Sequence, residues 1–444
     1  MEGGFNVIEN DYKIDKISEL PDFLLQQVLS FLTIKQVVQS SLLSKRWKHV
    51  WFTIPVLEFD GAYFENTKKR LESLCCDINL SSLKKLSLVK VRTNDQIIHN
   101  LVAGCPVIED IRFEFCYGLE NIHFSALPKL KAIKLESSEL KMVELEASNL
   151  CYACITAYHA SEINLVQCKN LKELNLEALC IADEWFRNHI SQLPLIEVVT
   201  LSNCNKLKNI KISSHILKKL YLHMCKELIE VELDTPALLK LSYLGWCNLS
   251  LSLNASAYLS EVIYQMLLPP INHWDVQKIE LISKLSNSKS LHLLRFQSAK
   301  DVVIPQELRD TLPSPSYLVK QLKVSLSRPD TGSEIDKLVD NLLWISPLPE
   351  VVVIAYRINV KPWEDTTSFK FSYKKPIFDE ENPSCCKFLP NPCWRHCLKT
   401  VTIENIRVRP DEETLKAEKE TLEKYFYENA KFLESFQFLC GVVG

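Results

Sequence analysis

A short apolar unit recurs along the middle of the chain. It has two apolar residues separated by two positions, and a third apolar residue two positions further on. Five successive copies begin at Ile196, Leu207, Leu217, Leu228 and Leu238. Such alternation of apolar and other residues is typical of a half-buried strand. The starts advance by 11, 10, 11 and 10 residues, so each pair of units predicts one coil that contains two short strands.

Every second unit ends in a cysteine, at Cys204 and Cys225, with Cys247 one place late. A fixed period between about 20 and 29 residues, with cysteine or asparagine buried at the turn after a strand, is typical of a leucine-rich-repeat solenoid. We therefore expect these thiols to be structural and buried, because single cysteines one coil apart stack as a column. Metal binding by these thiols is the rival interpretation.

The same pattern continues in weaker form on both sides of this region. Earlier copies begin at Ile108 and Leu130, the register slips between about 145 and 195, and the pattern becomes irregular after about 255. The sequence also predicts four further features: a helix within Leu179–Leu193, a helix at Ser333–Leu343, a strand at Glu350–Ala355, and a loop or domain boundary at Lys361–Pro392, which is rich in proline and charge.

The concave face of such a solenoid is where partners generally bind. The residue between the last two apolar positions of a unit points to that face. This register predicts Thr200, Tyr221 and Ser242 as target-binding candidates, with Arg112 in an earlier coil. Plain solvent exposure is the alternative for each of them.

The chain begins with an amphipathic helical segment. Ile17–Leu32 predicts a helix entered through Pro21, whose missing N–H would lack a partner in the first turn anyway. Asp22 places negative charge at the positive end of the helix dipole. Three- and four-residue steps then give one wide apolar stripe, formed by Leu24, Leu25, Val28, Leu29 and Leu32.

Two more short helices follow, at about Lys35–Leu43 and from Ser44, the latter carrying Trp47. Three helices in about 35 residues cannot bury this much apolar surface among themselves. Excess exposed apolar surface indicates an interface with a partner. From the pattern alone, a small helical cap on the following domain remains the alternative.

Three blocks of this segment resemble the F-box, particularly its plant type: Leu20-Pro21-Asp22, Val28-Leu29-Ser30-Phe31-Leu32 and Leu43-Ser44-Lys45-Arg46-Trp47. The resemblance extends from Ile17 to about Asp60 without a gap. It departs from the family at Thr33, where proline is usual, and at Gln39, where a basic residue is common.

The resemblance implies binding to a Skp-family adaptor, and through it to a cullin scaffold that carries a RING protein. Some of the matching residues would instead hold the three helices together. The matching positions, as expected adaptor contacts, are Leu20, Pro21, Leu24, Val28, Leu29, Leu32, Leu43 and Trp47.

The carboxyl end predicts a strand, a helix and a closing strand. Cys397–Ile403 alternates as a strand, and Pro410-Asp411-Glu412-Glu413 opens a helix with acidic residues in its first turn. Phe436 and Phe438 mark the closing strand. Physically this is a cap, since an open solenoid end would leave core exposed. The arrangement resembles the FBD module of many plant F-box/repeat proteins, notably at Cys397-Leu398-Lys399 and Glu428-Asn429-Ala430-Lys431.

Composition narrows the function classes. The net charge of −3 gives no basic field for a nucleic-acid backbone. Nine glycines, with neither a P-loop nor a GxSxG motif, argue against nucleotide-dependent enzymes and hydrolases. No apolar stretch serves as a signal peptide or approaches a membrane span. We therefore expect no membrane association, a location in cytoplasm or nucleus, and reduced thiols.

Cys385, Cys386, Cys393, His396 and Cys397 form a cluster in the sequence. A structural zinc site commonly uses two closely spaced pairs of ligands, and adjacent cysteines with Cys393-x3-Cys397 are poor versions of that. The sequence therefore predicts no metal site and no cofactor.

The sequence thus predicts a mixed α+β protein with three parts: an F-box at residues 14–60, an irregular leucine-rich-repeat solenoid at 61–385, and an FBD-like cap at 386–444. We expect a non-catalytic substrate receptor of a cullin-RING ubiquitin ligase, whose repeats bind a target protein. The alternative is an F-box/repeat protein that binds the adaptor without directing ubiquitination.

Overall fold

The structure is a computed structural model that divides into two compact units, Met1–Lys169 and Asn170–Gly444. The described residues are 19–30, 40, 44–61, 80–158, 160, 162–245, 249–254, 259–266, 274, 276–285, 288–296, 298–311, 318–327, 334–356, 365–377, 384–386, 393–407 and 412–442.

The first unit begins with two described helices, α1 (Asp22–Ser30) and α3 (Lys45–Phe52). The second of the three helices expected from the sequence lies outside the described residues. The first strand of the main sheet follows α3 directly and pairs in parallel with the next one. The main-sheet strands of this unit, in spatial order, are β1 (Val56–Asp60), β2 (Lys85–Val89), β3 (Asp110–Glu114), β5 (Ala132–Glu136) and β7 (Tyr152–Thr156).

A second parallel sheet in this unit contains the alternate strands β4 (Asn121–Phe124), β6 (Met142–Leu145) and β8 (Glu162–Asn164). Helix α5 (Asp95–Ala103) occupies the corresponding part of the coil between β2 and β3, and it contacts β4. Ile98, Leu101 and Val102 of α5 are buried. A coil of this unit therefore returns through either a short strand or a helix.

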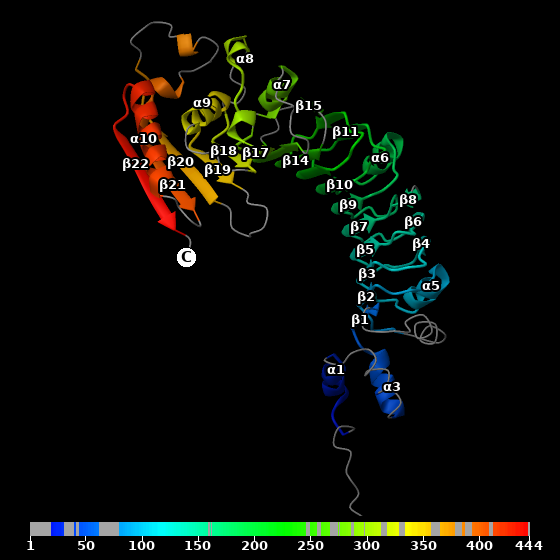
Figure 1. Ribbon diagram of the computed structural model, residues 1–444. Helices are drawn as coiled ribbons and strands as arrows, with labels where there is room; N and C mark the ends of the chain where they lie inside the picture. The colour runs from blue at the N-terminus through cyan, green and yellow to red at the C-terminus, as the bar shows by residue number, and fades with distance from the viewer. Residues whose placement is uncertain are drawn as a thin grey trace, which may run out of the picture. The chain divides into compact units, whose positions relative to one another are not determined.

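The second unit repeats this plan (Figure 1). Its parallel main-sheet strands are β9 (Glu173–Glu177), β10 (Val198–Ser202), β12 (Lys219–His223), β14 (Lys240–Gly245), β16 (Glu261–Met266), β17 (Ser290–Phe296), β18 (Gln321–Leu326) and β19 (Val351–Tyr356). The other strands and the helices of its coils are α6 (Asp183–Ile190), β11 (Asn209–Ser213), β13 (Glu230–Asp234), β15 (Ser250–Asn254), α7 (Val276–Leu285), α8 (Gln306–Thr311) and α9 (Ile335–Ile345).

The two-strand coil predicted from the sequence is confirmed. Val198 pairs with Lys219 and Lys219 with Lys240, so neighbouring strands are one 21-residue step apart. The intervening strands β11, β13 and β15 form the second sheet. Beyond β16 the coils lengthen because helices α7, α8 and α9 replace the second short strand, which explains the irregular pattern after residue 255.

The structure also accounts for the slipped register between about 145 and 195. Strand β7 occupies a regular place in the sheet, but its two buried apolar positions are Ala153 and Ile155, and Cys154 lies between them. The alanine weakens the apolar signal. The coil after β9 (Glu173–Glu177) returns through α6, the helix that we expected within Leu179–Leu193.

The expectation of a loop throughout Lys361–Pro392 is wrong. Strand β20 (Asp365–Tyr373) lies within it and pairs antiparallel with both β19 and β21 (Leu398–Arg407). Thr367, Phe369 and Phe371 are buried at alternate positions of β20. This period-2 burial forms the strand, and the charged and proline-rich flanks concealed it in the sequence.

The predicted strand-helix-strand end is confirmed. After β21 the chain forms α10 (Glu412–Asn429) and then β22 (Ser435–Val442), which pairs in parallel with β21. Leu422 and Phe426 of α10 are buried, and the Phe426 ring contacts those of Trp394, Phe371 and Phe436. The expected helix at Ser333–Leu343 and the strand at Glu350–Ala355 correspond to α9 and β19.

The turns after five of the main-sheet strands share one geometry. The residue directly after β2, β3, β9, β10 and β12 has a positive φ, at Lys90, Phe115, Ala178, Asn203 and Met224. One or two residues later the chain turns into the interior. In three of these turns the next residue is a buried cysteine whose thiol donates to a carbonyl of the preceding coil: Cys116 to Leu88, Cys204 to Leu176 and Cys225 to Leu201. Cys168, which follows strand β8 of the second sheet, donates in the same way to Leu145.

These contacts explain the periodic cysteines. A thiol is small enough for the interior and provides a weak donor for a backbone carbonyl. Among the described cysteines, all are free thiols. Among the helices of the described residues, none has the length and apolar character needed to cross a lipid bilayer.

The buried thiols should make stability sensitive to alkaline pH. Burial raises the pKa of Cys105 from 9.0 to about 12, and that of Cys116 from 9.0 to about 11. The unfolded chain loses these protons near pH 9 while the folded chain keeps them, so their contribution is complete below about pH 9 and declines above it. The loss is about 1.4 kcal/mol per pH unit and thiol.

We expect the Cys116→Ala variant to lose less thermal stability than the wild type between about pH 8.5 and pH 10, under reducing conditions. The exposed thiol of Cys440 provides the control, and Cys440→Ala should follow the wild type. Equal pH dependence in Cys116→Ala and wild type would contradict this assignment.

Candidate functional site

Helix α1 begins at Pro21. The carbonyl of Pro21 accepts hydrogen bonds from the amides of Leu24 (2.9 Å) and Leu25 (3.2 Å), which form the first turn. Helix α3 begins after Ser44, whose hydroxyl accepts a hydrogen bond from the Trp47 amide at 3.2 Å. A proline in the first turn and a serine at the N-cap are both residue types that favour the start of a helix.

Two polar contacts join α1 to α3. Arg46 pairs with Asp22, with 2.8 Å between Nη2 and Oδ1, and the same guanidinium donates to the carbonyl of Leu20. Gln26 Nε2 donates to Thr53 Oγ1 at 2.9 Å. The Arg46–Asp22 pair is exposed, so its contribution to stability is about 0–1 kcal/mol. Its main effect is to fix the position of α3 against the start of α1.

The interior of this helical pair contains Leu25, Leu29, Trp47 and Val50, all of them buried. Two expected adaptor contacts are among them: Leu29 is 3% exposed and Trp47 is 4% exposed. In the described structure these two side chains hold the domain together. The sequence stripe combined two faces of α1 and could not separate them.

The opposite side of α1 carries exposed apolar residues. Val28 is 37% exposed and Pro21 is also exposed, while Leu20 and Leu24 are partly exposed. The most exposed apolar side chain of this helix is Phe23, at 62%. Phe23 lies outside the stripe read from the sequence, so sequence reasoning missed it. Leu32 and Leu43 lie outside the described residues.

We call Leu20, Pro21, Phe23, Leu24 and Val28 the α1 face. A large aromatic ring and branched aliphatic groups in contact with water cost free energy, which burial against a partner removes. Scattered single apolar residues are ordinary on protein surfaces, whereas a contiguous group on one short helix indicates an interaction site. The α1 face can therefore bind a complementary apolar groove.

The second candidate surface is the open face of the main sheet in the second unit, the face away from the buried alternate positions. Strand register places Thr200 beside Tyr221 and Tyr221 beside Ser242, as the sequence predicted. Thr200 and Tyr221 are half-buried and partly available. Ser242 is only 5% exposed, so its expected exposure on this face is wrong. His223 Nε2 lies 3.0 Å from Ser242 Oγ, and the two atoms form a hydrogen bond.

The open face of this unit also contains residues that the sequence analysis did not select. Lys240 Nζ lies over the Tyr221 ring, 5.9 Å from its centre, and forms an ion pair with Glu261 at 2.6 Å. His292 and Lys323 continue the Tyr221 row on β17 and β18. The repeat pattern that would have identified His292 and Lys323 was weak, because the coils beyond residue 255 have irregular lengths.

Burial lowers the pKa of both His223 and His292 below the usual 6.5. Each imidazole is therefore neutral at pH 7 and can donate one hydrogen bond and accept another. Together with Tyr221, Lys240 and Glu261, they give this face a mixed aromatic and polar character suited to recognising a peptide or protein surface.

A serine–histidine–carboxylate combination on this face lacks the geometry of a catalytic triad. Ser290 Oγ lies 3.1 Å from His292 Nε2, but the other side of the ring, Nδ1, is 3.7 Å from Glu261 Oε1. A hydrogen bond that orients a catalytic histidine is about 2.6–3.2 Å long. Glu261 is instead paired with Lys240.

Arg112, the candidate in the first unit, is exposed on β3. Its guanidinium pairs with Asp110 on the same strand, with 3.0 Å between Nη2 and Oδ2, and this hydrogen bond raises the pKa of Arg112. On the next strand Lys134 pairs with Glu114 at 2.9 Å. The open face of the first unit is thus a row of compensated charges around Arg112.

Comparison with known families identifies two domains. The F-box domain matches residues 17–58, and the At1g61320/AtMIF1 LRR domain matches residues 156–330. The first match contains both α1 and α3. The second contains the regular coils and the open-face row from Thr200 to Lys323.

Relatives from Arabidopsis thaliana have the same two domains in their names. F-box/LRR-repeat protein 25 is 28% identical over 46% of this chain and 73% of its own length. Putative F-box/LRR-repeat protein At5g02930 is 26% identical over 46% of this chain, and F-box/FBD/LRR-repeat protein At5g56420 is 26% identical over 50%. The alignments cover 41% and 54% of those two relatives.

The division of α1 into an interior and an exposed side can be tested by stability. We expect Leu29→Ala to destabilise the helical domain by about 2–5 kcal/mol, because it leaves a cavity between α1 and α3. Phe23→Ala should change stability by about 0.5 kcal/mol or less. Thermal unfolding followed by circular dichroism checks both variants, and equal effects would show that the two sides are assigned wrongly.

Proposed function

We propose that this chain, with its F-box and plant-type leucine-rich-repeat domains, is the substrate-recognition subunit of an SCF-type cullin-RING ubiquitin ligase. The F-box binds a Skp-family adaptor, which connects the chain to a cullin scaffold and a RING protein, and the repeats bind a target protein. The observation that carries this proposal is the exposed α1 face within the region that matches the F-box domain.

The α1 face supports adaptor binding energetically. Complete burial of one large apolar side chain contributes about 1.5–3 kcal/mol. Phe23 and Val28 are both exposed, so an adaptor that covers them gains much of this free energy. Two or three such residues, together with Pro21 and Leu24, are sufficient for a stable complex after the cost of association is subtracted.

The open face of the second unit supports target binding. It offers Tyr221 and Lys240 beside two neutral histidines on rigid, hydrogen-bonded strands. Tyrosine combines a large contact area with few rotatable bonds, so ordering it on binding costs little entropy. In this role no residue of the chain performs chemistry, and the ubiquitin transfer belongs to the partner proteins. The compartment is cytoplasm, nucleus or both.

We assign the carboxyl-terminal strands and α10 to an FBD-like module. The strand-helix-strand order of β21, α10 and β22 and the FBD in a relative's name support this assignment. The Phe426 cluster gives the module its own small core.

Adaptor binding is tested with two exposed positions. Phe23→Glu combined with Val28→Glu should weaken binding of a purified plant Skp-family adaptor by at least about 100-fold, because two apolar contacts are replaced by charges that lose water on binding. Calorimetry or biolayer interferometry measures the dissociation constant.

The matched control is Ile229→Glu, which introduces the same charge at an exposed apolar position of the repeats. It should bind the adaptor like the wild type. Wild-type affinity in the Phe23/Val28 variant would refute the proposed contact, provided that its circular dichroism spectrum matches that of the parent.

A second experiment separates the ligase receptor from an F-box protein that binds the adaptor without directing ubiquitination. The chain is assembled with adaptor, cullin and RING protein, and incubated with plant extract, a charged conjugating enzyme and ubiquitin. Proteins captured by the chain should gain ubiquitin, and this gain should disappear with the Phe23/Val28 variant. Capture without ubiquitination would favour the non-ligase alternative.

A further inference from the structure

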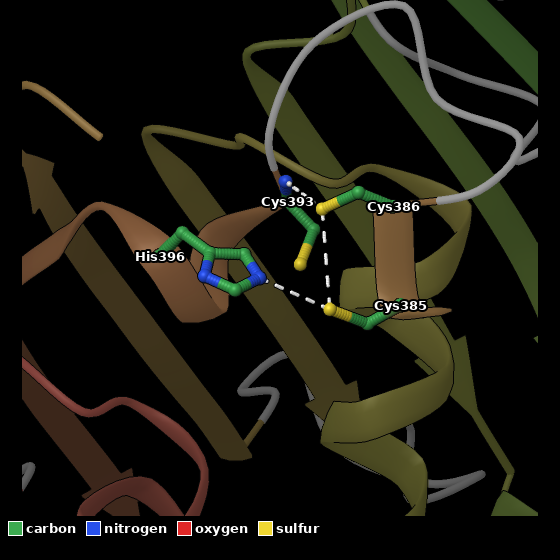
Figure 2. Close-up of side chains that lie close together, drawn as sticks. All are labelled: Cys385, Cys386, Cys393 and His396. Atoms are coloured by element: carbon green, nitrogen blue, oxygen red, sulfur yellow. Dashed lines mark hydrogen bonds between the residues drawn. The ribbon is translucent and has the colours of Figure 1, made fainter. Parts of the chain in front are cut away.

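Three thiols and an imidazole meet near the carboxyl-terminal module. Cys385 and Cys386 lie on the short helix η3 (Ser384–Cys386), while Cys393 and His396 lie at the two ends of η4 (Trp394–His396). Their ligating atoms all lie within 4.8 Å of one another. Figure 2 shows the three sulfurs and the His396 ring turned toward one another from these two segments.

The separations match a tetrahedral zinc site. Zinc–sulfur bonds of about 2.3 Å at tetrahedral angles place two sulfurs about 3.8 Å apart. Cys385 Sγ lies 3.9 Å from Cys386 Sγ, and it lies 3.1 Å from His396 Nε2. All four ligand atoms lie within 4.8 Å of one another, close enough for a single ion to be shared among them.

The helical geometry of η4 explains why the sequence did not predict this arrangement. Cys393 is the N-cap of η4, and its carbonyl accepts a hydrogen bond from the His396 amide at 3.1 Å, so this single turn keeps the two residues close together. Spacing along the sequence suggests Cys393 and Cys397 as the pair instead. In the structure Cys397 Sγ donates to the carbonyl of Cys393 at 3.5 Å and is not part of the group of four.

Backbone and charged groups around the cluster suit thiolate ligands. The amide of Cys393 donates to Cys386 Sγ at 3.2 Å, and an N–H bond to a sulfur stabilises its deprotonated form. Burial raises the pKa of the Cys385 thiol, and the positive charge of Arg395 partly offsets this effect. The Arg395 side chain is partly buried and pairs with Asp340, with 2.7 Å between Nη2 and Oδ1. Zinc with three thiolates carries a net charge of −1, which this guanidinium partly balances.

The surroundings give the site a structural role. Trp394 is buried beside Tyr425 and Phe426 of α10. Asp340 of α9 binds Arg395 at 2.7 Å. The same carboxylate binds Arg309 and Tyr425 at 2.8 Å. Four protein ligands leave no open position for a reacting water, which is typical of a structural rather than a catalytic zinc.

We propose that Cys385, Cys386, Cys393 and His396 bind one structural Zn²⁺ ion that joins η3 to the core of the carboxyl-terminal module. The four ligands come from two segments, so the ion closes the stretch of chain between Cys386 and Cys393. This inference is independent of adaptor or target binding.

The test is the zinc content of the full chain, purified with its adaptor under reducing conditions and without a metal-binding tag. Elemental analysis should find about one zinc per chain above the content of the adaptor alone. Cys385→Ser should reduce this to background, and because Cys385 is exposed the change should leave the fold intact. Cys397→Ser and Cys440→Ser, which remove thiols outside the site, should keep the zinc.

Cobalt substitution provides a second measurement on the same proteins. Co²⁺ added to the metal-free chain should produce the visible absorption bands of a tetrahedral thiolate site, and Cys385→Ser should lack them. The proposal is overturned if the reduced wild type, supplied with equimolar Zn²⁺, retains no more metal than Cys385→Ser. It is also overturned if mass spectrometry finds two of these cysteines joined in a disulfide in the native chain.

Discussion

Parallel pairing between the strands of successive coils is the constraint on which both units depend. In the regular coils, such as those of β10 and β12, a main-sheet strand buries two apolar side chains beneath it and satisfies its backbone groups only through the coils on either side. A single coil has no core of its own, so stability comes from the interfaces between neighbours. The rigid backbone then determines where side chains such as Tyr221 stand on the open face. Binding positions follow from the register rather than from local folding.

Much of this plan could be predicted because its signal is periodic. Val199, Leu201, Leu220 and Leu222 repeat at one spacing and are all completely buried. The prediction failed where physical causes lay outside the period. Strand β20 has alternating buried residues, but its charged and proline-rich flanks concealed them and its pairing with β19 and β21 is long-range. Ser242 is hydrogen-bonded to a histidine of the neighbouring coil.

The helical domain illustrates a different limit. A stripe at three- and four-residue steps identifies the apolar residues of α1, but it does not tell which of them face α3. That division depends on where Trp47 and Val50 pack, and it places Leu29 inside and Val28 outside. The exposure of Phe23 was not predicted for the same reason, because the position of α3 determines which side of the first turn of α1 is covered. The thiol cluster depends on one short 3₁₀ turn that holds His396 close to Cys393. The spacing of these residues in the sequence does not reveal that turn.

The pairing of two strands per coil has a consequence for how such a chain can change length. Removal of a segment of about 21 residues deletes one complete coil, and duplication of such a segment adds one. In both cases every later residue keeps an equivalent environment. A change of half that length would exchange the roles of the two sheets from that point onward and would bring turn residues into the interior. Deletions or duplications of whole coils are therefore the length changes that this architecture tolerates best.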